Sequence, residues 1–307
     1  MDSRQLRYFT TIYDQRSLAG ASGAERVAVS ALSYHLANLE AETGVALFVR
    51  KPRGLEPTAA GERLYVHAKA ILRAMDAAQR DLVAARETVS GTIAVGMAYS
   101  AVKAIGVDLA RRVLEDHPQL RLTLTESLSG TTLMHLTAVD VDLALVYNPP
   151  VTPMLRSSPM LEERMVLVGL PDIIGATSEA ITVAEVLELP IILLRQGISA
   201  RALLEDAQLL RKLEARARLQ MNSVQAIAGA LQAGLGCAIG TRLFMREHLE
   251  SGALHWRPIR DPVLTRTLYL CELAERPPTI ALEAVRDMIR ELVADAVGRG
   301  VWEARLV

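Results

Sequence analysis

The stretch that decides the fold of the N-terminal region is Val27-Ala28-Val29-Ser30-Ala31-Leu32-Ser33-Tyr34-His35-Leu36-Ala37-Asn38-Leu39. Leu32, Leu36 and Leu39 are spaced at i, i+4 and i+7, so a helix places them on one face. The side chains that can donate or accept hydrogen bonds on the other faces are Ser30, Ser33, Tyr34, His35 and Asn38. Such a helix fits the major groove of DNA, although an ordinary surface helix can show the same pattern.

The neighbouring segments favour the DNA-binding interpretation. Leu6, Phe9 and Ile12 predict an amphipathic first helix over about residues 3–14. Ser17 is a suitable N-cap for a second, short helix, and a turn near residues 25–27 leads into the helix at 28–39. Two short helices joined by a tight turn form a helix-turn-helix, which we expect here.

The next segment predicts a β-hairpin with a basic tip. Two short apolar pieces within residues 47–58 flank a turn that carries Arg50, Lys51 and Arg53. Three cations on one turn are well placed to neutralise DNA phosphates, whereas the same cluster elsewhere is usually a solvated turn. Because it directly follows a helix-turn-helix, we interpret the hairpin as a phosphate-binding wing.

A long helix is expected from residue 59 to residue 89, with Thr58 as its cap. Its apolar residues, among them Leu64, Ala68, Ile71 and Met75, form one stripe. A long helix with a single apolar seam more often packs against a partner helix than against its own domain. This pattern therefore predicts pairing of two subunits.

The composition excludes some classes of protein. The chain has 307 residues, is 50% hydrophobic and carries a net charge of −1, which is typical of globular proteins of two or three domains. No apolar run reaches the length of a membrane span, and residues 1–5 do not resemble a secretion signal, so we expect a cytoplasmic protein without a membrane partner. Cys237 and Cys271 lie in apolar surroundings and are interpreted as reduced core residues, with a redox-sensing pair as the alternative.

Beyond residue 90, short apolar strands alternate with helices. Examples are the strands expected at 92–97, 120–125 and 141–147, and the final helix near 279–297. This alternation predicts an α/β region with a mostly parallel sheet. We expect residues 91–162 and 267–307 to form one unit and residues 163–266 to form a second.

Ligands of open α/β sheets bind beyond the carboxyl ends of the strands, close to helix N-termini. The polar residues expected at those ends are Ser100, Ser129, Thr131, Thr132, Ser199 and Asn222, with Arg195 and Arg201 nearby. Hydroxyl groups, free N–H groups and guanidinium groups together favour a carboxylate or another small anion. Helix capping is the alternative role for each serine and threonine.

Residues 1–61 resemble the winged helix-turn-helix of LysR-type transcriptional regulators. The matching residues are Leu6, Phe9, Ser17-Leu18, Ala21, Ala24, Val27, Ala31-Leu32-Ser33, Leu39-Glu40, Gly44-Val45, Leu47-Phe48, Arg50, Arg53-Gly54, Thr58 and Gly61. The chain departs from the family at Ala28-Val29-Ser30, where Ser-Gln-Pro is usual, and at Glu25, where an apolar residue is usual. A further departure is Thr241, where proline is common.

The resemblance implies three parts: a DNA-binding domain at 1–58, a linker and dimerisation helix at 59–90, and an effector-binding domain at 91–307 with two Rossmann-like lobes, like those of a periplasmic binding protein. It implies double-stranded DNA, a small-molecule effector and further copies of the chain, as a homodimer or homotetramer, as partners, with RNA polymerase as another candidate. Residues 146–149 and 190–201 resemble the nitrogen-assimilation-control branch of the family.

The sequence contains no recognisable catalytic motif. Its six histidines are scattered, and no nucleophile elbow, phosphate loop or dinucleotide-binding motif follows a strand. We therefore predict a regulator that is not an enzyme and that uses no metal or cofactor. The alternatives are a cytoplasmic α/β solute-binding protein or enzyme with an incidental helical N-terminus, and a nucleoid-structuring protein without sequence specificity.

Overall fold

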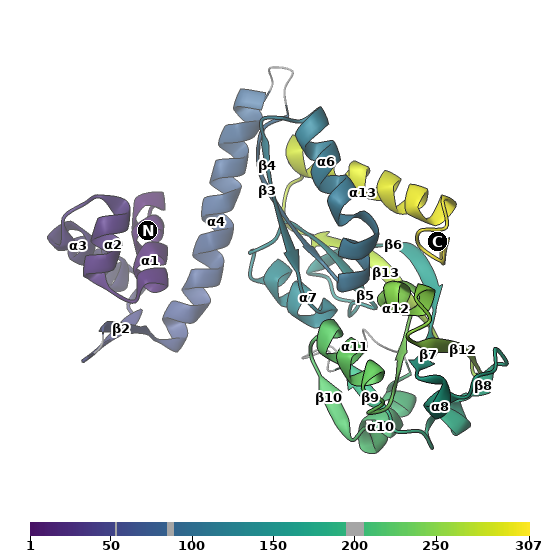
Figure 1. The fold of residues 1–307 in the computed structure, drawn as a ribbon. Helices are drawn as coiled ribbons and strands as arrows, with labels where there is room; N and C mark the ends of the chain where they lie inside the picture. The colour runs from purple at the N-terminus through teal and green to yellow at the C-terminus, as the bar shows by residue number, and fades with distance from the viewer. Residues whose placement is uncertain (53, 85–88, 195–205) are drawn as a thin grey trace. The chain divides into compact units, whose positions relative to one another are not determined.

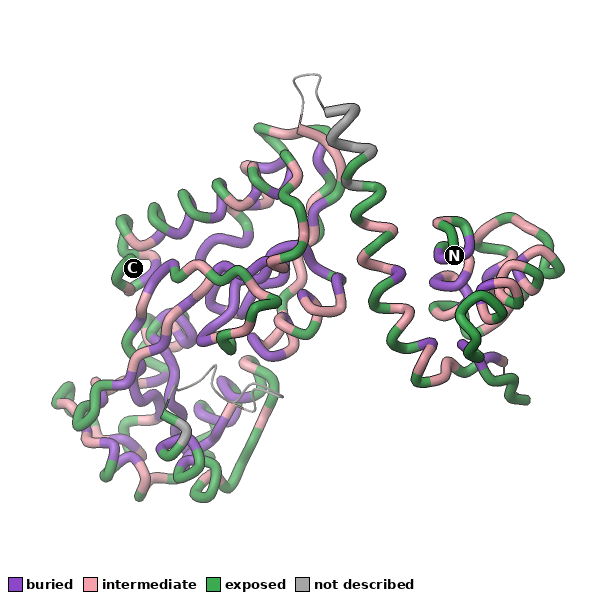
Figure 2. Tube along the Cα trace, turned by 180° about the vertical axis from the view of Figure 1, so that it is seen from behind, coloured by how far each residue is buried: buried purple, intermediate pink, exposed green. Residues whose placement is uncertain are grey.

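The computed structural model describes the whole chain except residue 53, residues 85–88 and residues 195–205 (Figure 1). The chain divides into two compact units, Met1–Arg86 and Glu87–Val307. Within each unit the buried residues concentrate on the inward faces of the helices and on the sheet strands (Figure 2).

The N-terminal unit contains the three short helices, the hairpin and the long helix that the sequence predicts. Its elements are α1 (Ser3–Gln15), α2 (Leu18–Glu25), α3 (Val29–Thr43), β1 (Phe48–Lys51), β2 (Gly54–Pro57) and α4 (Ala59–Ala84). Ser17 caps α2 by accepting a hydrogen bond from the backbone N–H of Gly20 at 3.3 Å. The hydroxyl of Thr58 accepts one from Gly61 N at 3.0 Å at the start of α4, and the last part of the helix expected at 59–89 lies outside the described residues.

A small core holds this unit together. Phe9 and Ile12 of α1 are buried against Leu32 and Leu39 of α3, and Ala68 brings α4 into the same cluster. Leu36, the third leucine of the predicted stripe, is half-buried. The i, i+4, i+7 pattern therefore predicted the buried face of α3 correctly.

The second unit contains a six-stranded sheet in the order β14-β6-β13-β5-β3-β4. Its strands are β3 (Gly91–Met97), β4 (Leu120–Glu126), β5 (Leu143–Tyr147), β6 (Leu155–Arg164), β13 (Thr265–Leu273) and β14 (Ala304–Leu306). The helices associated with it are α5 (Tyr99–Ala101), a π-helical turn at Val102–Gly106, α6 (Val107–Asp116), α7 (Ser129–Thr137) and α13 (Ile280–Gly298).

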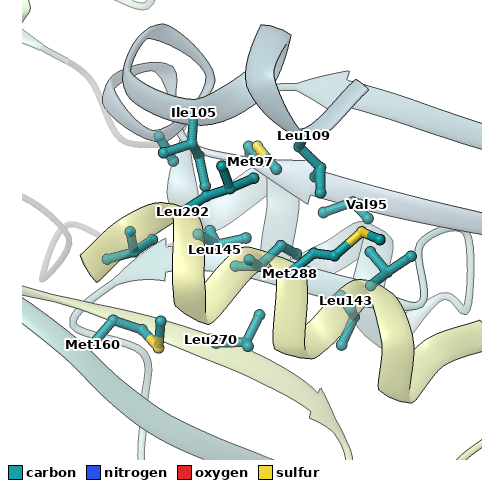
Figure 3. Packing of buried hydrophobic residues seen from close by; sticks show 14 of the residues in the cluster. Val95, Met97, Ile105, Leu109, Leu143, Leu145, Met160, Leu270, Met288 and Leu292 are labelled. Atoms are coloured by element: carbon teal, nitrogen blue, oxygen red, sulfur yellow. The ribbon is translucent and has the colours of Figure 1, made fainter. Parts of the chain in front are cut away.

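The core of this lobe lies between the sheet and the helices α6 and α13 (Figure 3). Met288 and Leu292 of α13 contact the same cluster as Leu109 of α6 and the sheet residues Val95 and Leu145. Because α13 belongs to this cluster, the C-terminal part of the chain packs on the six-stranded sheet.

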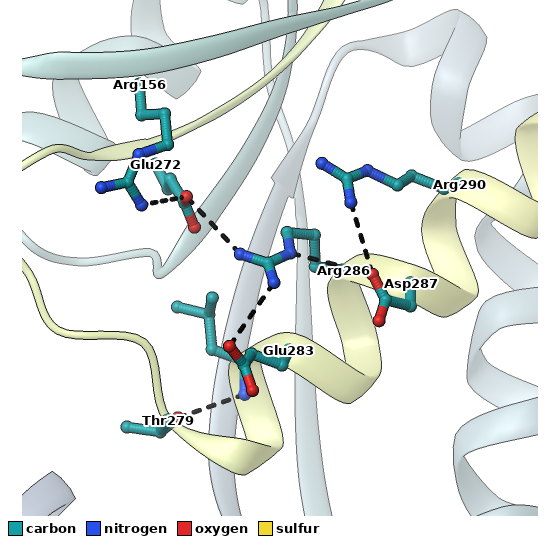
Figure 4. Close-up of polar contacts among 8 residues, drawn as sticks. Arg156, Glu272, Thr279, Glu283, Arg286, Asp287 and Arg290 are labelled. Atoms are coloured by element: carbon teal, nitrogen blue, oxygen red, sulfur yellow. Dashed lines mark hydrogen bonds and ion pairs between the residues drawn. The ribbon is translucent and has the colours of Figure 1, made fainter.

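Ion pairs position α13 on the edge of that core (Figure 4). Arg286 lies 3.7 Å from the carboxylate of Glu272 on β13 and 3.6 Å from Glu283 of its own helix. Glu272 also accepts a hydrogen bond from Arg156 of β6 at 2.8 Å. These contacts connect α13 to two neighbouring strands.

A smaller lobe is built on a four-stranded sheet in the order β11-β7-β12-β8 and a two-stranded sheet, β10-β9. The strands are β7 (Val166–Gly169), β8 (Ile181–Thr182), β9 (Ile192–Leu194), β10 (Leu219–Met221), β11 (Cys237–Gly240) and β12 (His255–Arg260). The helices are α8 (Pro171–Ile174), α9 (Val183–Val186), α10 (Ala207–Arg216), α11 (Val224–Gln232), a 3₁₀ turn at Leu243–Met245 and α12 (Arg246–Glu250).

The expectation of a mostly parallel sheet was wrong, because both larger sheets are mixed. β3 pairs parallel with β4 and β5, but β13 pairs antiparallel with β5 and β6, and β7 pairs antiparallel with β11 and β12. The sequence Leu155–Arg164, which contains Pro159 and several polar residues, did not show a strand pattern, although it forms the ten-residue strand β6. The chain leaves the larger sheet at Met165 and returns to it with β13.

Candidate DNA interface and effector site

The helix α3 presents a polar face to solvent. Ala28 is its N-cap, with an extended backbone, and Ser30 in the first turn is exposed. The side chain of Tyr34 is 64% exposed, which is unusual for an aromatic residue. Since the leucines hold the opposite face in the core, these two side chains are available to a partner.

The other three predicted contact residues of α3 are half-buried. His35 packs against two tyrosines, with ring centroids 5.1 Å from Tyr8 and 5.7 Å from Tyr34. Ser33 and Asn38 lie at the flanks of the exposed face. The structure therefore brings the five residues onto one helix but leaves Ser30 and Tyr34 the most accessible.

The basic hairpin is attached to the end of α1. Arg50 and Lys51 are exposed on β1, and the Lys51 ammonium lies 3.8 Å from Glu56. Leu55 N donates a hydrogen bond to Arg16 O at 2.8 Å, and a Cβ on the neighbouring Gly54 would lie 2.5 Å from the same oxygen. Glycine is required at this close approach. Arg53, the third predicted cation, lies outside the described residues.

Two carboxylates that pattern analysis did not assign a role connect these elements. Glu40 of α3 accepts hydrogen bonds from Leu47 N at 2.7 Å and Phe48 N at 3.3 Å, which ties the helix to the start of the hairpin. Glu25 accepts a hydrogen bond from the hydroxyl of Thr11 at 2.5 Å, so an acidic residue at this position joins α2 to α1.

In the regulatory unit, Ser100 belongs to a buried polar cluster. Arg266 Nη2 donates a hydrogen bond to Ser100 Oγ at 3.1 Å, and the same guanidinium pairs with Glu163 at 2.5 Å. Glu163 also accepts a hydrogen bond from Trp302 Nε1 at 2.8 Å, and the ring of Tyr147 lies 3.7 Å from the Arg266 Cζ. All five residues are buried. A buried charge requires such compensation.

Tyr147 and Arg266 of this cluster each keep one protonation state. Burial raises the pKa of Tyr147 well above its usual value, and the nearby Glu163 carboxylate adds to the effect. Burial alone would lower the pKa of Arg266, but the interactions with Glu163 and Tyr147 together outweigh it, and the pKa is raised. Tyr147 is therefore neutral and Arg266 charged over the physiological pH range.

Ser129 and Thr132 also have partners inside the protein. Ser129 Oγ accepts a hydrogen bond from Tyr147 N at 3.1 Å, and the hydroxyls of Thr132 and Ser127 lie 2.7 Å apart. Neither caps α7, whose N-cap is Leu128. Ser100 and Ser129 thus meet around Tyr147 at the end of β5, as strand-end positions predict, but their hydroxyls are already occupied.

The remaining predicted effector residues are placed differently. Thr131 is half-buried on α7, and Asn222 is exposed immediately before α11, whose N-cap is Ser223 rather than Asn222. Arg195, Ser199 and Arg201 lie outside the described residues. Sequence reasoning missed Tyr147, Glu163 and Arg266, because the Glu163–Arg266 pair spans 103 positions and no local pattern marks it.

The two cysteines are free and buried in different apolar clusters. Burial raises the pKa of Cys237 to about 12 and that of Cys271 to about 11. Both thiols are therefore protonated and poor nucleophiles near neutral pH.

A helix-turn-helix with a basic hairpin, joined to a two-lobed α/β unit, defines the class of DNA-binding regulators with a ligand domain. The family described as bacterial regulatory helix-turn-helix protein, lysR family, matches residues 3–62, and the LysR substrate binding domain matches residues 86–294. The chain is 32% identical over 297 residues to the nitrogen assimilation regulatory protein nac of Klebsiella aerogenes, with 96% of each chain covered. It is 28% identical to the Escherichia coli protein of that name, covering 99% of this chain and 98% of that one. The chain belongs to the LysR family of transcriptional regulators, which are not enzymes.

Solved structures of this family share the fold. A full-length OxyR variant from Pseudomonas aeruginosa superposes with a TM-score of 0.70 at 19% identity, covering 95% of this chain and 94% of that one. Full-length CbnR in complex with its target DNA superposes with a TM-score of 0.64 at 19% identity, covering 96% of this chain and 100% of that one. In the part of the chain that the structure describes, no helix is long and apolar enough to cross a membrane.

Proposed function

We propose that α3 reads DNA by entering the major groove, with Ser30, Ser33, Tyr34, His35 and Asn38 as its contact residues. The support is the exposed polar face, which lies opposite the buried Leu32 and Leu39. Small hydrogen-bonding side chains can reach base edges, where each base pair presents a distinct pattern. Because Val29 and Ser30 replace the family's usual glutamine and proline, we expect the operator preference of this protein to differ from that of its relatives.

The hairpin then holds the phosphate backbone through Arg50, Lys51 and Arg53. Each cation that neutralises a phosphate releases counterions, so its contribution weakens as the salt concentration rises. We expect this contribution to be the same for all DNA sequences.

Two subunits pair through α4, and the pairs assemble into a homotetramer that binds inverted repeats. Ile71 and Met75 of α4 are 39% and 43% exposed, although both belong to the apolar seam. A partner helix would cover them, and the paired geometry would set the spacing of the half-sites. RNA polymerase is a further partner, which the protein would contact while it is bound to the operator. The protein would act in the cytoplasm.

The effector is a small anion or carboxylate bound between the two lobes. Thr131 is half-buried and Asn222 is exposed, so their polar groups are accessible to a ligand. We expect Ser199, Arg195 and Arg201 to contact the effector as well, and the buried Ser100, Ser129 and Thr132 to support the site. Nitrogen metabolites are the first ligands to screen, because the two relatives described above are named nitrogen assimilation regulatory proteins. Binding alters DNA affinity if the effector prefers one arrangement of the lobes.

The observation that carries this proposal is the exposed polar face of α3, in a unit whose hairpin also exposes Arg50. Binding of the full chain to DNA from its own upstream region should be measured at several salt concentrations. Arg50→Ala should weaken binding to every sequence and lower the salt slope by about one. Arg121→Ala, which removes an exposed arginine of β4, is the matched control. An unchanged slope for Arg50→Ala would exclude the phosphate contact.

The effector site has a separate test. Thr131→Ala should abolish the response of DNA binding to the active ligand while leaving basal DNA binding intact. Thr123→Ala, an exposed threonine on β4, should respond normally. A normal response of Thr131→Ala would place the effector elsewhere.

A further inference from the structure

A cavity lies between the two lobes of the regulatory unit, beside the passage of the chain from β6 to β7. Both strands are labelled in Figure 1. It has a volume of about 610 Å³, within the range of pockets that hold small organic ligands. Strands β6 and β14 of the larger sheet line one side, and strands β7 and β12 of the smaller sheet line the other. Ser100, Thr131 and Asn222 of the proposed effector site are not among its lining residues.

The charged residues at this cavity leave an excess of positive charge. Arg242 pairs with Glu303 at 2.8 Å, and Arg305 pairs with Glu162 at 3.3 Å. Arg164 also lines the cavity and is exposed, and its side chain makes no ion pair or hydrogen bond with any residue that the structure describes. An uncommitted guanidinium in a cavity is suited to a carboxylate, which it binds through two parallel hydrogen bonds.

Thr241 adds an unsatisfied polar group to the same wall. Its side chain is 3% exposed, and among the described residues its hydroxyl oxygen has no hydrogen-bond partner. A buried hydroxyl without a partner is costly, and the cost is removed when a ligand supplies the missing bond.

Two further charged lining residues have partners, because Glu163 pairs with Arg266 and Arg260 pairs with Asp261. The remaining lining residues are apolar and include an aromatic ring. Trp256 of β12 lies under Arg242, whose Cζ is 4.5 Å from the ring centroid. Leu243, Ile259 and Val263 contribute aliphatic surface. Arg242 thus contacts Trp256 of the smaller lobe and Glu303, which immediately precedes β14 of the larger lobe. The cavity therefore favours a ligand with an apolar body as well as a charge.

We infer that this cavity is a second ligand site of the regulatory domain, for a small carboxylate with an apolar body. The carboxylate pairs with Arg164, the hydroxyl of Thr241 forms a hydrogen bond with the ligand, and the apolar body packs against Trp256 and its aliphatic neighbours. Because the two sides of the cavity belong to different lobes, a ligand here favours one angle between them. It therefore couples to the effector site by changing that angle.

Calorimetric titration of the full chain tests this site, with phenylacetate, benzoate and 4-methylpentanoate as probes and phenylacetamide as the uncharged counterpart of the first. At least one of the three carboxylates should bind. Where phenylacetate binds, phenylacetamide should bind about tenfold more weakly. Arg164→Gln should weaken binding at least about tenfold, as expected for the loss of a charge-assisted pair. Arg121→Gln, a matched change on an exposed arginine outside the cavity, should have no effect.

Thr241→Val provides a readout that does not depend on a loss of folding. It should raise the melting temperature of the free protein, because it removes an unsatisfied buried hydroxyl, and weaken carboxylate binding about fivefold to tenfold. Two results would overturn the proposal: no binding of any of the three carboxylates, or binding that neither Arg164→Gln nor Thr241→Val weakens. In the second case, Thr131→Ala is the diagnostic variant. If it abolishes carboxylate binding that Arg164→Gln and Thr241→Val leave unchanged, the carboxylate occupies the effector site. That result would exclude the second ligand site and leave the proposed function intact.

Discussion

The helix α3 and the strand ends of the regulatory domain carry similar uncharged polar side chains, but these side chains have opposite exposure in the structure. On α3, Ser30 and Tyr34 face solvent, whereas Ser100 and Ser129 in the regulatory unit are buried and already hydrogen-bonded. A helix packed on one side exposes whatever lies opposite its apolar stripe. At a strand end, exposure depends on which distant segments cover it, so the same residue types can be ligand contacts or internal bonds.

The largest expected effect comes from the buried cluster. Glu163→Leu would leave Arg266 buried without its carboxylate, and should lower the free energy of unfolding of the regulatory unit by about 3–5 kcal/mol. Chemical denaturation followed by tryptophan fluorescence measures the loss, because both tryptophans, Trp256 and Trp302, lie in the regulatory unit. Glu162→Gln, which breaks the more exposed pair with Arg305, should cost less than about 1 kcal/mol. If Glu163→Leu and Glu162→Gln lowered the free energy of unfolding equally, the buried cluster would not differ from an exposed ion pair.

Two serines compare the regions directly. Ser129→Ala removes the acceptor of Tyr147 N and should lower the free energy of unfolding by about 1–3 kcal/mol. Ser30→Ala changes an exposed side chain and should change stability by less than about 0.5 kcal/mol, while weakening operator binding. A large stability loss for Ser30→Ala would mean that α3 uses its polar face for folding.

The smallest effect at neutral pH concerns the cysteines. With folded pKa values of about 12 for Cys237 and about 11 for Cys271, neither thiol should react with an aromatic disulfide reagent at pH 8 until the protein unfolds. An unfolded thiol has a pKa of about 8.5, so the folded state holds more protons above that pH. The stability that the buried thiols contribute is therefore present below about pH 8.5 and is lost as the pH rises through the folded values. Rapid labelling of the native protein would contradict their role as core residues.

Sequence reasoning succeeded where the relevant signal is local. The leucine spacing of α3, the caps Ser17 and Thr58, and the basic turn at Arg50 each depend on residues close in the chain, and the DNA-binding unit followed from them. The mixed sheet order did not follow, because β6 lacks a strand pattern and its pairing with β13 joins segments about a hundred residues apart. Thr241 gave a partial signal as a departure from the family pattern, but only the structure shows that its hydroxyl lacks a partner among the described residues.

The central claim is that the exposed face of α3 reads DNA sequence, and one titration tests it most directly. The affinity of the full chain, wild type and Tyr34→Ala, should be measured by fluorescence anisotropy on a duplex from its own upstream region and on a shuffled duplex of the same composition. We predict that the wild type prefers the upstream duplex and that Tyr34→Ala lowers this preference about tenfold, with little change on the shuffled duplex and an unchanged salt slope. Equal affinity of the wild type for both duplexes, or a preference that Tyr34→Ala leaves intact, would contradict the claim.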